Sequence, residues 1–383
     1  MRKEISALLA GYESQIYKDF ETLVNINSFS SNEAGIVQMQ DALKKVAAGV
    51  GVVLESVYSS QKARPHLLYG KIQQEDFYAI MGHFDTVHPP ESDFTTMWEE
   101  EGLLRGPGTN DMKSGLIVAI YVLAILQKLF PDQILPIKAL FNSDEEIGSF
   151  DSEELIRDIF SGAKAGFVFE PGRIEGPSVV TARKGILNAE IHITGKSAHS
   201  GVEPWNGVNA IVEAAHVIIA LEKLNDYEWG ISVGCNLING GTAMNVVAPD
   251  CILGLDIRYR ERDQKTVLTQ AIEAMVTMPT DPKISMAYHV LHDRPPMQKS
   301  AQSDLLYQKY KFVSESLGLA CGEASTGGGS DANTLSDMGI PVIDGVGGVG
   351  NFSHTKKEYT IKSSIFERIE IFCIFMAEEI AKA

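Results

Sequence analysis

The chain has 383 residues, more than one compact domain usually needs, so we expect two domains. It carries 50 acidic against 33 basic residues and a formal net charge of -17. The long-range field of such a chain repels nucleic acid and anionic membrane surfaces, which excludes both as expected partners. A small peptide or acyl amino acid remains the expected partner, because one local arginine can override the global field.

The N-terminal residues predict an amphipathic helix and no signal peptide, because Glu4, Glu13 and Asp19 interrupt any apolar core. The four cysteines are scattered and form no CxxC pair. This usage is typical of reduced thiols, and it fits neither a disulfide framework nor a thiolate zinc site. We therefore expect a cytoplasmic protein.

The first part of the chain alternates between helical and apolar strand patterns. In chain order, the expected elements are helices 1–26 and 33–50, strands 52–58, 66–72 and 77–85, helix 114–130, strand 137–146, helix 151–160 and strand 165–171. The apolar run 116–126 is too short to span a bilayer and predicts a buried helix. This alternation is typical of an α/β fold with a largely parallel sheet flanked by helices, whose ligands bind beyond the carboxyl ends of the strands.

The pattern changes after Lys184, where residues 186–196 alternate strictly between apolar and polar, as in a half-buried antiparallel strand. The elements that follow are helix 207–224, strands 231–240 and 251–260, helix 263–277 and strand 283–290. This β-α-β-β-α-β order is ferredoxin-like. We therefore predict a catalytic domain formed by 1–182 and 296–383, and an inserted α+β lid domain at 183–295.

The motif GHFDTVHP places His83 and Asp85 at the end of an apolar strand, where alternate residues share a face. An imidazole that binds a metal needs its second nitrogen held, typically by a carboxylate, and Asp85 is well spaced for that. The alternative is an ordinary histidine beside a solvated aspartate. We expect His88 to be such an ordinary histidine.

Asp111, in GPGTNDMKSGL, stands just before the buried helix. It could bridge two metal ions, or it could simply cap the helix, a position that aspartate favours. In NSDEEIGS, adjacent carboxylates repel one another unless cations or protons neutralise them. On an extended backbone Glu145 and Glu146 point in different directions, so one can bind metal while the other acts as a base. The alternative is a solvated acidic loop.

Two further metal-ligand residues follow predicted strands, Glu170 in FVFEP and His354 in GNFSHTKKEY. Together with GKSAHSG and GVGNFSH, the motifs occur in the order found in the M20 metallopeptidases, and the inserted domain is similar too. That family includes glutamate carboxypeptidases, acetylornithine and succinyl-diaminopimelate deacylases, aminoacylases and aminotripeptidases. The resemblance spans residues 80–360, and FEP followed by VVTARKG and GGGSDAN resembles the glutamate carboxypeptidase branch.

The resemblance implies a role for each site residue. Asp111 would bridge two metals, His83 and Glu170 would complete one of them, and Glu146 and His354 the other. Glu145 resembles the general base, Asp85 the orienting partner of His83, and His199 a histidine that stabilises the oxyanion, in its own chain or across a dimer. The implied substrate-binding residues are Asn245, Arg258 and Arg294. For the two arginines, a structural salt bridge is the alternative.

The charges agree with this implication. Two Zn²⁺ ions bring four positive charges, three carboxylates supply three negative charges, and one hydroxide would make the cluster neutral. Water bound to Zn²⁺ has a pKa of about 7, so hydroxide is available while Glu145 takes up the proton. Oxygen and imidazole ligands would also accept Co²⁺ or Mn²⁺.

We therefore expect a hydrolase that cleaves a peptide or N-acyl amide bond, first of all an exopeptidase of the glutamate carboxypeptidase type. The alternatives are an N-acyl amino acid deacylase or an aminotripeptidase, and a non-catalytic homologue is disfavoured because the chain has Glu145 and every ligand. Residues 345–350 match GxGxxG, but a dinucleotide site needs a following helix that the sequence does not predict. We expect a homodimer formed through the inserted domain.

Overall fold

The computed structural model describes residues 1–61, 64–71, 75–174 and 178–382. The chain forms two compact units: unit 1 comprises Met1–Ala182, Lys299–Thr326 and Ser330–Ala383, and unit 2 comprises Arg183–Gln298 and Gly327–Gly329. The sequence placed the second boundary at 295/296, whereas the units change at 298/299. The difference arises because the Arg183 and Met297 backbones pair and the Arg183 side chain donates a hydrogen bond to the carbonyl oxygen of Gly328, at 3.1 Å.

Unit 1 contains an eight-stranded sheet whose four central strands are parallel. Its spatial order is β1 (Glu55–Val57), β2 (His66–Tyr69), β6 (Ile137–Asn142), β3 (Tyr78–His83), β7 (Ala165–Val168), β14 (Val342–Asp344), β8 (Val179–Arg183) and β13 (Glu323–Thr326). Strand β3 pairs in parallel with both β6 and β7, and β7 pairs in parallel with β14. The strand expected at 66–72 ends at Tyr69, and Ile72 lies outside the described residues.

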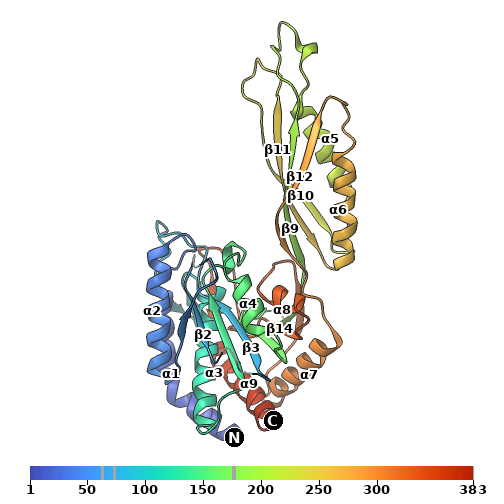
Figure 1. Cartoon of the computed structure of the whole chain (residues 1–383). Helices are drawn as coiled ribbons and strands as arrows, with labels where there is room; N and C mark the ends of the chain where they lie inside the picture. The colour runs from blue at the N-terminus through green and yellow to red at the C-terminus, as the bar shows by residue number, and fades with distance from the viewer. Residues whose placement is uncertain (62–63, 72–74, 175–177, 383) are drawn as a thin grey trace. The chain divides into compact units, whose positions relative to one another are not determined.

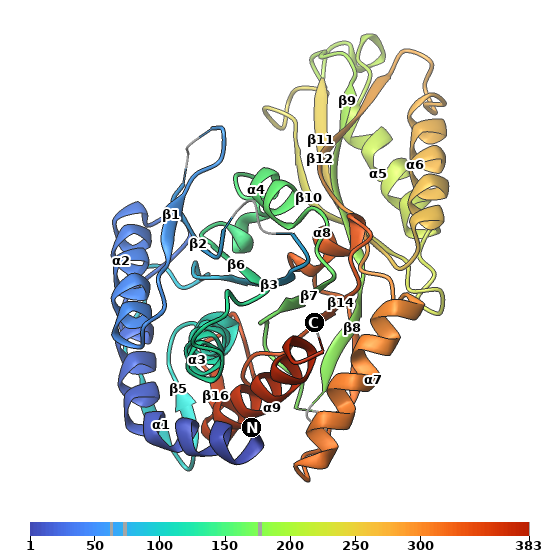
Figure 2. The same cartoon turned by 60° about the horizontal axis from the view of Figure 1, so that its bottom comes forward.

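Helices cover both faces of this sheet, as Figure 2 shows, with α3 and α9 on one side and α4 and α8 on the other. The helices of unit 1 are α1 (Arg2–Val24), α2 (Glu33–Gly49), α3 (Ser114–Leu129), α4 (Glu153–Phe160), α7 (Ala301–Ser316), α8 (Ala332–Asp337) and α9 (Lys362–Ile380). The segment Thr109–Leu129 is long and apolar enough to cross a bilayer, but 83% of its most apolar window is buried inside the protein. Helix α3 is therefore the core helix expected from the sequence, packed between α1 and α9.

A second, smaller sheet of unit 1 connects two loops that the site depends on. It runs in the order β15 (Gly350–Asn351), β16 (Tyr359–Ile361), β5 (Leu103–Arg105) and β4 (Trp98–Glu100). Strand β5 leads into the loop that carries Asp111, and β15 and β16 flank the loop that carries His354. These strands are two or three residues long, too short to leave a periodic pattern in the sequence.

Unit 2 is an antiparallel sheet in the order β10-β11-β9-β12 with two helices on one face (Figure 1). In chain order its elements are β9 (Gly185–Thr194), α5 (Ala210–Glu222), β10 (Ser232–Gly240), β11 (Asp250–Tyr259), α6 (Arg262–Val276) and β12 (Ser285–Arg294). Alternate residues of β9, from Leu187 to Ile193, are buried in the core beneath the helices. The predicted α/β fold with an inserted ferredoxin-like unit is confirmed.

Candidate metal centre

Three of the candidate segments begin where parallel strands of unit 1 end. His83 is the last residue of β3, and Glu145 and Glu146 lie in a short turn after β6. Glu170 follows β7 by two residues. Because the carboxyl ends of parallel strands meet at one edge of a sheet, these side chains come together without any further element.

Asp111 lies in an irregular turn, Thr109–Lys113, that precedes α3. Its Oδ1 is 3.2 Å from Nε2 of His83, and its Oδ2 is 3.3 Å from Nε2 of His354. The N-cap of α3 is Lys113 and makes no side-chain cap bond, so Asp111 is not the helix cap that the sequence left open. Two oxygens of one carboxylate face two different histidines, which is the arrangement that a ligand shared between two cations requires.

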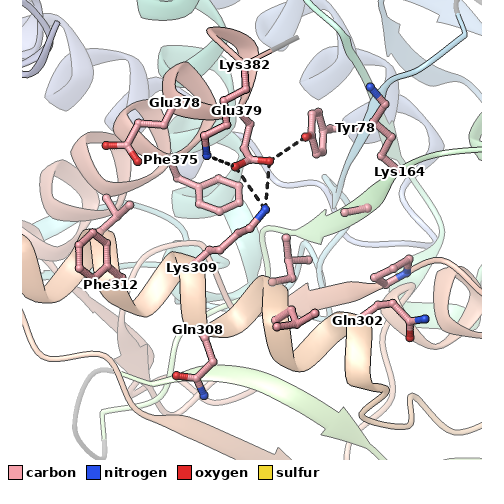
Figure 3. A pocket seen from close by; sticks show the side chains of 15 residues that line it. Tyr78, Lys164, Gln302, Gln308, Lys309, Phe312, Phe375, Glu378, Glu379 and Lys382 are labelled. Atoms are coloured by element: carbon pink, nitrogen blue, oxygen red, sulfur yellow. Dashed lines mark hydrogen bonds and ion pairs between the residues drawn. The ribbon is translucent and has the colours of Figure 1, made fainter.

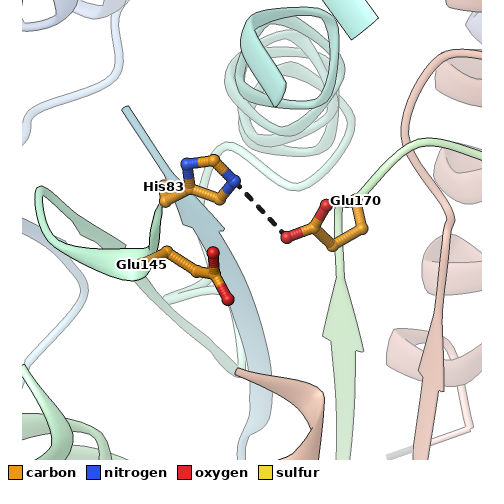
Figure 4. A group of neighbouring side chains, drawn as sticks. All are labelled: His83, Glu145 and Glu170. Carbon is orange, nitrogen blue, oxygen red and sulfur yellow. Dashed lines mark ion pairs between the residues drawn. The ribbon is translucent and has the colours of Figure 1, made fainter. Parts of the chain in front are cut away.

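The remaining ligands complete two halves around Asp111. Nε2 of His83 lies 3.4 Å from Oε1 of Glu170, and Nε2 of His354 lies 3.2 Å from Oε2 of Glu146. Figure 4 shows Glu145 and Glu170 directed into the space beside the His83 ring, and one nitrogen or oxygen atom from each of these three residues lies within 4.8 Å of the other two. The structure thus brings together the five predicted ligands and the predicted base.

The charges of this cluster fit two divalent cations. Burial and the Asp111 charge raise the pKa of Glu146 to about 8 and the pKa of Glu170 to about 7. Hydrogen bonds to Asp111 and Glu146 raise the pKa of His354 to about 11. Oε1 of Glu146 is also buried without a hydrogen-bond partner among the described residues. In the metal-free protein, bound protons therefore neutralise the negative charge that divalent cations would otherwise neutralise. The oxygen and imidazole donors suit Zn²⁺, Co²⁺ or Mn²⁺.

Asp85 is fully buried and orients more of the site than the sequence suggested. Nδ1 of His83 donates to the Asp85 backbone oxygen at 3.0 Å, with carboxylate Oδ1 at 3.4 Å. The same carboxylate accepts the backbone N–H of Glu145 at 3.1 Å and that of Glu146 at 3.2 Å. One side chain therefore fixes a histidine ligand and the turn that carries both glutamates.

Sequence reasoning missed Glu358, a fully buried carboxylate behind Asp111. It accepts hydrogen bonds from the Gly108, Asn110 and Asp111 amides and from the His88 ring. His88 is therefore a satisfied structural histidine, as expected. The only signal for Glu358 was its place four residues after His354, and nothing in the sequence linked it to the Asp111 loop.

The predicted site residues of unit 2 fall into two groups. The first group consists of His199 and Asn245. His199 is exposed, and its Nδ1 accepts the backbone N–H of Gly201 at 3.1 Å. In the neutral ring the proton is then on Nε2, which makes that atom a hydrogen-bond donor. The N–H of Ser200 donates to the carbonyl of Asn245 at 3.0 Å, so His199 and Asn245 lie on adjacent segments.

The second group is the pair of arginines. Arg258 and Arg294 are the cross-strand neighbours of Ile186 on its two sides, so both belong to the sheet face opposite the helices. Arg258 makes two hydrogen bonds to Asp256, at 2.6 and 2.7 Å, which is the salt bridge that the sequence left as an alternative. Arg294 is buried.

A pocket of about 690 Å³ lies at the other edge of the sheet, against the first residues of β3 and β7. Figure 3 shows Glu379 in it, held by Tyr78 at 3.1 Å, Lys309 at 3.3 Å and Lys382 at 2.8 Å. None of the residues that line it is a predicted site residue. The pocket is therefore separate from the metal centre.

The dinucleotide alternative fails on structure. Residues 345–350 lead into the short strand β15 and then into the His354 loop and β16. Within residues 345–361, all of which are described, no helix follows the glycines, so a pyrophosphate would meet no helix N-terminus here.

Residues 79–378 match the peptidase family M20/M25/M40. Carboxypeptidase G2 of Pseudomonas sp. (strain RS-16) is 28% identical over 362 residues, which cover 92% of this chain and 86% of that protein. Among solved structures, the aminopeptidase PepT of Bacillus cereus superposes with a TM-score of 0.73 at 22% identity, over 96% of this chain and 99% of the other. The YXEP protein of Bacillus subtilis, described as a dinuclear metal-binding peptidase, superposes with a TM-score of 0.71 at 13% identity, over 98% and 100% of the two chains.

Proposed function

Because the chain belongs to the peptidase family M20/M25/M40 and is thus a metallopeptidase-type hydrolase, we propose that it is a two-zinc exopeptidase that releases a C-terminal acidic residue. The observation that carries the metal chemistry is the Asp111 carboxylate, whose two oxygens face His83 and His354 at 3.2 and 3.3 Å. The choice of a carboxypeptidase rests on the 28% identity to carboxypeptidase G2 over 92% of the chain.

Five side chains hold the metals in this proposal. His83 and Glu170 would hold one ion, Glu146 and His354 would hold the other, and Asp111 would be shared. A bound zinc pair supplies Lewis acidity, which polarises the scissile carbonyl group and lowers the pKa of a water molecule. Zinc is our first choice of metal, and the same donors would accept Co²⁺ or Mn²⁺.

Glu145 is the proposed general base. Its carboxylate faces His83 and Glu170 (Figure 4), and Asp85 accepts its backbone N–H at 3.1 Å. In this role a Glu145 carboxylate oxygen takes a proton from the attacking water and then delivers it to the leaving amine. The hydrogen bond to Asp85 fixes the backbone from which the Glu145 side chain extends.

His199 is the proposed oxyanion donor. Gly201 occupies its Nδ1, so the proton on Nε2 is available to a negatively charged oxygen. The exposure of the ring supports this role, because the ring is accessible to a small substrate.

The proposed acidic substrate would use the two arginines of unit 2. Arg258 and Arg294 flank Ile186 on one sheet face, and guanidinium groups bind carboxylates with paired hydrogen bonds. Asp256 already engages Arg258, so a substrate carboxylate must displace or share that partner. Both arginines are proposed contacts of the substrate carboxylate, with Asn245, on the segment adjacent to His199, as a further contact.

A hydrolysis screen tests the proposal. The metal-free protein would be reconstituted with Zn²⁺, Co²⁺ or Mn²⁺ and offered peptides and folate-like amides with C-terminal glutamate, N-acyl amino acids, dipeptides and tripeptides, with a chelator control. We expect chelator-sensitive release of glutamate. If only N-acyl amino acids are hydrolysed, the deacylase alternative replaces the exopeptidase, and if only tripeptides are hydrolysed, the aminotripeptidase alternative does. Both alternatives need the same metals and base.

We also propose a homodimer formed through unit 2. Strand β10 is an edge strand with exposed apolar residues, Leu237 at 74% and Ile238 at 57% exposure, and Ile219 of α5 is 61% exposed. Unpaired strand edges with exposed apolar side chains are ready to pair with a second copy. Sedimentation at micromolar concentration checks this, and a clean monomer would contradict it.

A cytoplasmic location is proposed as well, in line with four free cysteines, and cell fractionation would check it.

A further inference from the structure

We infer that Glu358 is a positioning residue that sets the geometry between the bridging carboxylate of Asp111 and the loop of His354 before any metal binds. This inference rests on the proposed metal centre. It concerns a side chain that touches no substrate and is not itself one of the five proposed ligands.

The two oxygens of Glu358 accept four hydrogen bonds from two other segments. Oε1 accepts the N–H of Asn110 at 2.8 Å and of Asp111 at 2.9 Å, and Oε2 accepts the N–H of Gly108 at 3.1 Å. The fourth donor is Nε2 of His88, 2.8 Å from Oε2. Three of the four bonds therefore act on the backbone of the turn that aims the bridging carboxylate.

Glu358 also belongs to the segment that carries His354. Two further bonds join this segment to the Asp111 turn: Asn110 Nδ2 donates to Ser353 Oγ at 2.8 Å, and Thr360 Oγ1 donates to the Thr109 carbonyl at 2.8 Å. The pairing of β16 with β5 runs alongside them. The residues from Ser353 to Thr360 are thus fastened to the turn at several points, and Glu358 supplies most of the bonds.

The His354 half of the site needs such a support more than the His83 half does. His83 is 1% exposed and sits at the end of a central strand. The His354 side chain is 55% exposed, and its backbone adopts a φ of 66°, a left-handed conformation that residues with a side chain rarely take. No central strand holds this ligand, so the contacts of Glu358 determine where it lies relative to Asp111.

The chemistry of the carboxylate explains why glutamate is needed here. Its two oxygens can accept four hydrogen bonds, whereas the amide of glutamine offers one acceptor oxygen and an NH₂ group that would face other N–H donors. Glu358→Gln therefore keeps the size of the side chain and removes about half of its accepting capacity. Buried N–H groups left without an acceptor would force the turn, and Asp111 with it, to move.

The test measures metal binding and backbone protection in the full-length protein. Zinc titration of metal-free Glu358→Gln should show weaker binding than wild type by about 10- to 100-fold, the usual cost of losing a supporting contact behind a ligand. In the metal-free protein, hydrogen exchange should accelerate in the peptide covering residues 106–112 and stay unchanged in unit 2. Glu358→Asp keeps the negative charge but has a shorter side chain. Its zinc affinity and its exchange rate at residues 106–112 should lie between those of wild type and those of Glu358→Gln.

Glu213→Gln is the matched control. Glu213 is a buried carboxylate of unit 2 that accepts the N–H of Thr280 at 2.9 Å and its hydroxyl, so it holds a loop in a similar way but in the other unit. Its replacement should leave zinc affinity and exchange at 106–112 unchanged. The inference is overturned if Glu358→Gln, or Glu358→Asp should the first variant not fold, binds zinc like wild type with unaltered exchange. A wild-type protein that binds no metal would instead contradict the proposed function.

Discussion

The two units hold their candidate residues in different ways. In unit 1 the ligands contact one another at 3.2–3.4 Å across the ends of three parallel strands, and burial has already shifted their pKa values. In unit 2 His199 is exposed and Arg258 is occupied by Asp256. The five candidate metal ligands are therefore assembled within one unit, while the residues proposed to recognise the substrate or to stabilise an oxyanion belong to the other. Changes in unit 1 should therefore alter metal content, and changes in unit 2 should not.

The largest effect is expected from Asp111→Asn. The asparagine amide offers one oxygen and no negative charge, so it cannot be shared between the two metal ions as the carboxylate is proposed to be. Both metals and turnover should therefore be lost. Metal content by inductively coupled plasma mass spectrometry and kcat would measure this. Asp256→Asn in unit 2 is the control and should retain two metals. Full metal occupancy in Asp111→Asn would refute the bridging role.

Glu145→Gln should separate metal binding from catalysis within unit 1. Because Glu145 is the proposed base and not a ligand, the variant should keep both metals and lose about 10²- to 10⁴-fold in kcat. Turnover against pH and metal content on the same preparation check this. Metal loss, or turnover like that of wild type, would remove Glu145 from the role of base.

His199→Ala should lower kcat by about 10²- to 10³-fold, the scale for one oxyanion donor, without changing metal content. This variant tests the division between the units most sharply, because it should lower catalysis through a residue of unit 2, which contains none of the five proposed ligands. Steady-state kinetics at saturating metal would measure it. An unaffected rate would contradict the proposed oxyanion role of His199. A loss of metal would contradict the expectation that changes in unit 2 leave metal content unchanged.

The last prediction concerns pH. In the metal-free protein the pKa values of Glu146 and Glu170 are raised to about 8 and about 7, so both groups hold protons below those values. Metal ions must displace these protons, so affinity should fall as pH falls from 8 to 6, by about tenfold per pH unit for each proton displaced. Zinc affinity measured across this range would show it. An affinity independent of pH would mean that the glutamates are not ligands.

Much of the fold could be predicted from local pattern, which also marked candidate residues of the centre, whereas their individual roles came from the resemblance to the M20 family. His83 ends an apolar strand, Glu146 and Glu170 lie shortly after two others, and the strict alternation of β9 marks unit 2. The small sheet escaped notice because strands of two or three residues carry no period.

The parts that could not be predicted depend on contacts between distant segments. Asp111 stands before a helix, where a cap and a bridging ligand have the same sequence pattern, and only the positions of His83 and His354 separate the two. Glu358 acts on backbone amides that lie about 250 residues earlier in the chain, and backbone donors leave no trace in the residue types.

Anomalous diffraction at the zinc absorption edge, from crystals of the zinc-loaded protein, tests the central claim most directly. The account predicts two peaks, roughly 3.5–4 Å apart, one beside each oxygen of the Asp111 carboxylate. A single peak, or two peaks with Asp111 turned away from one of them, would contradict it.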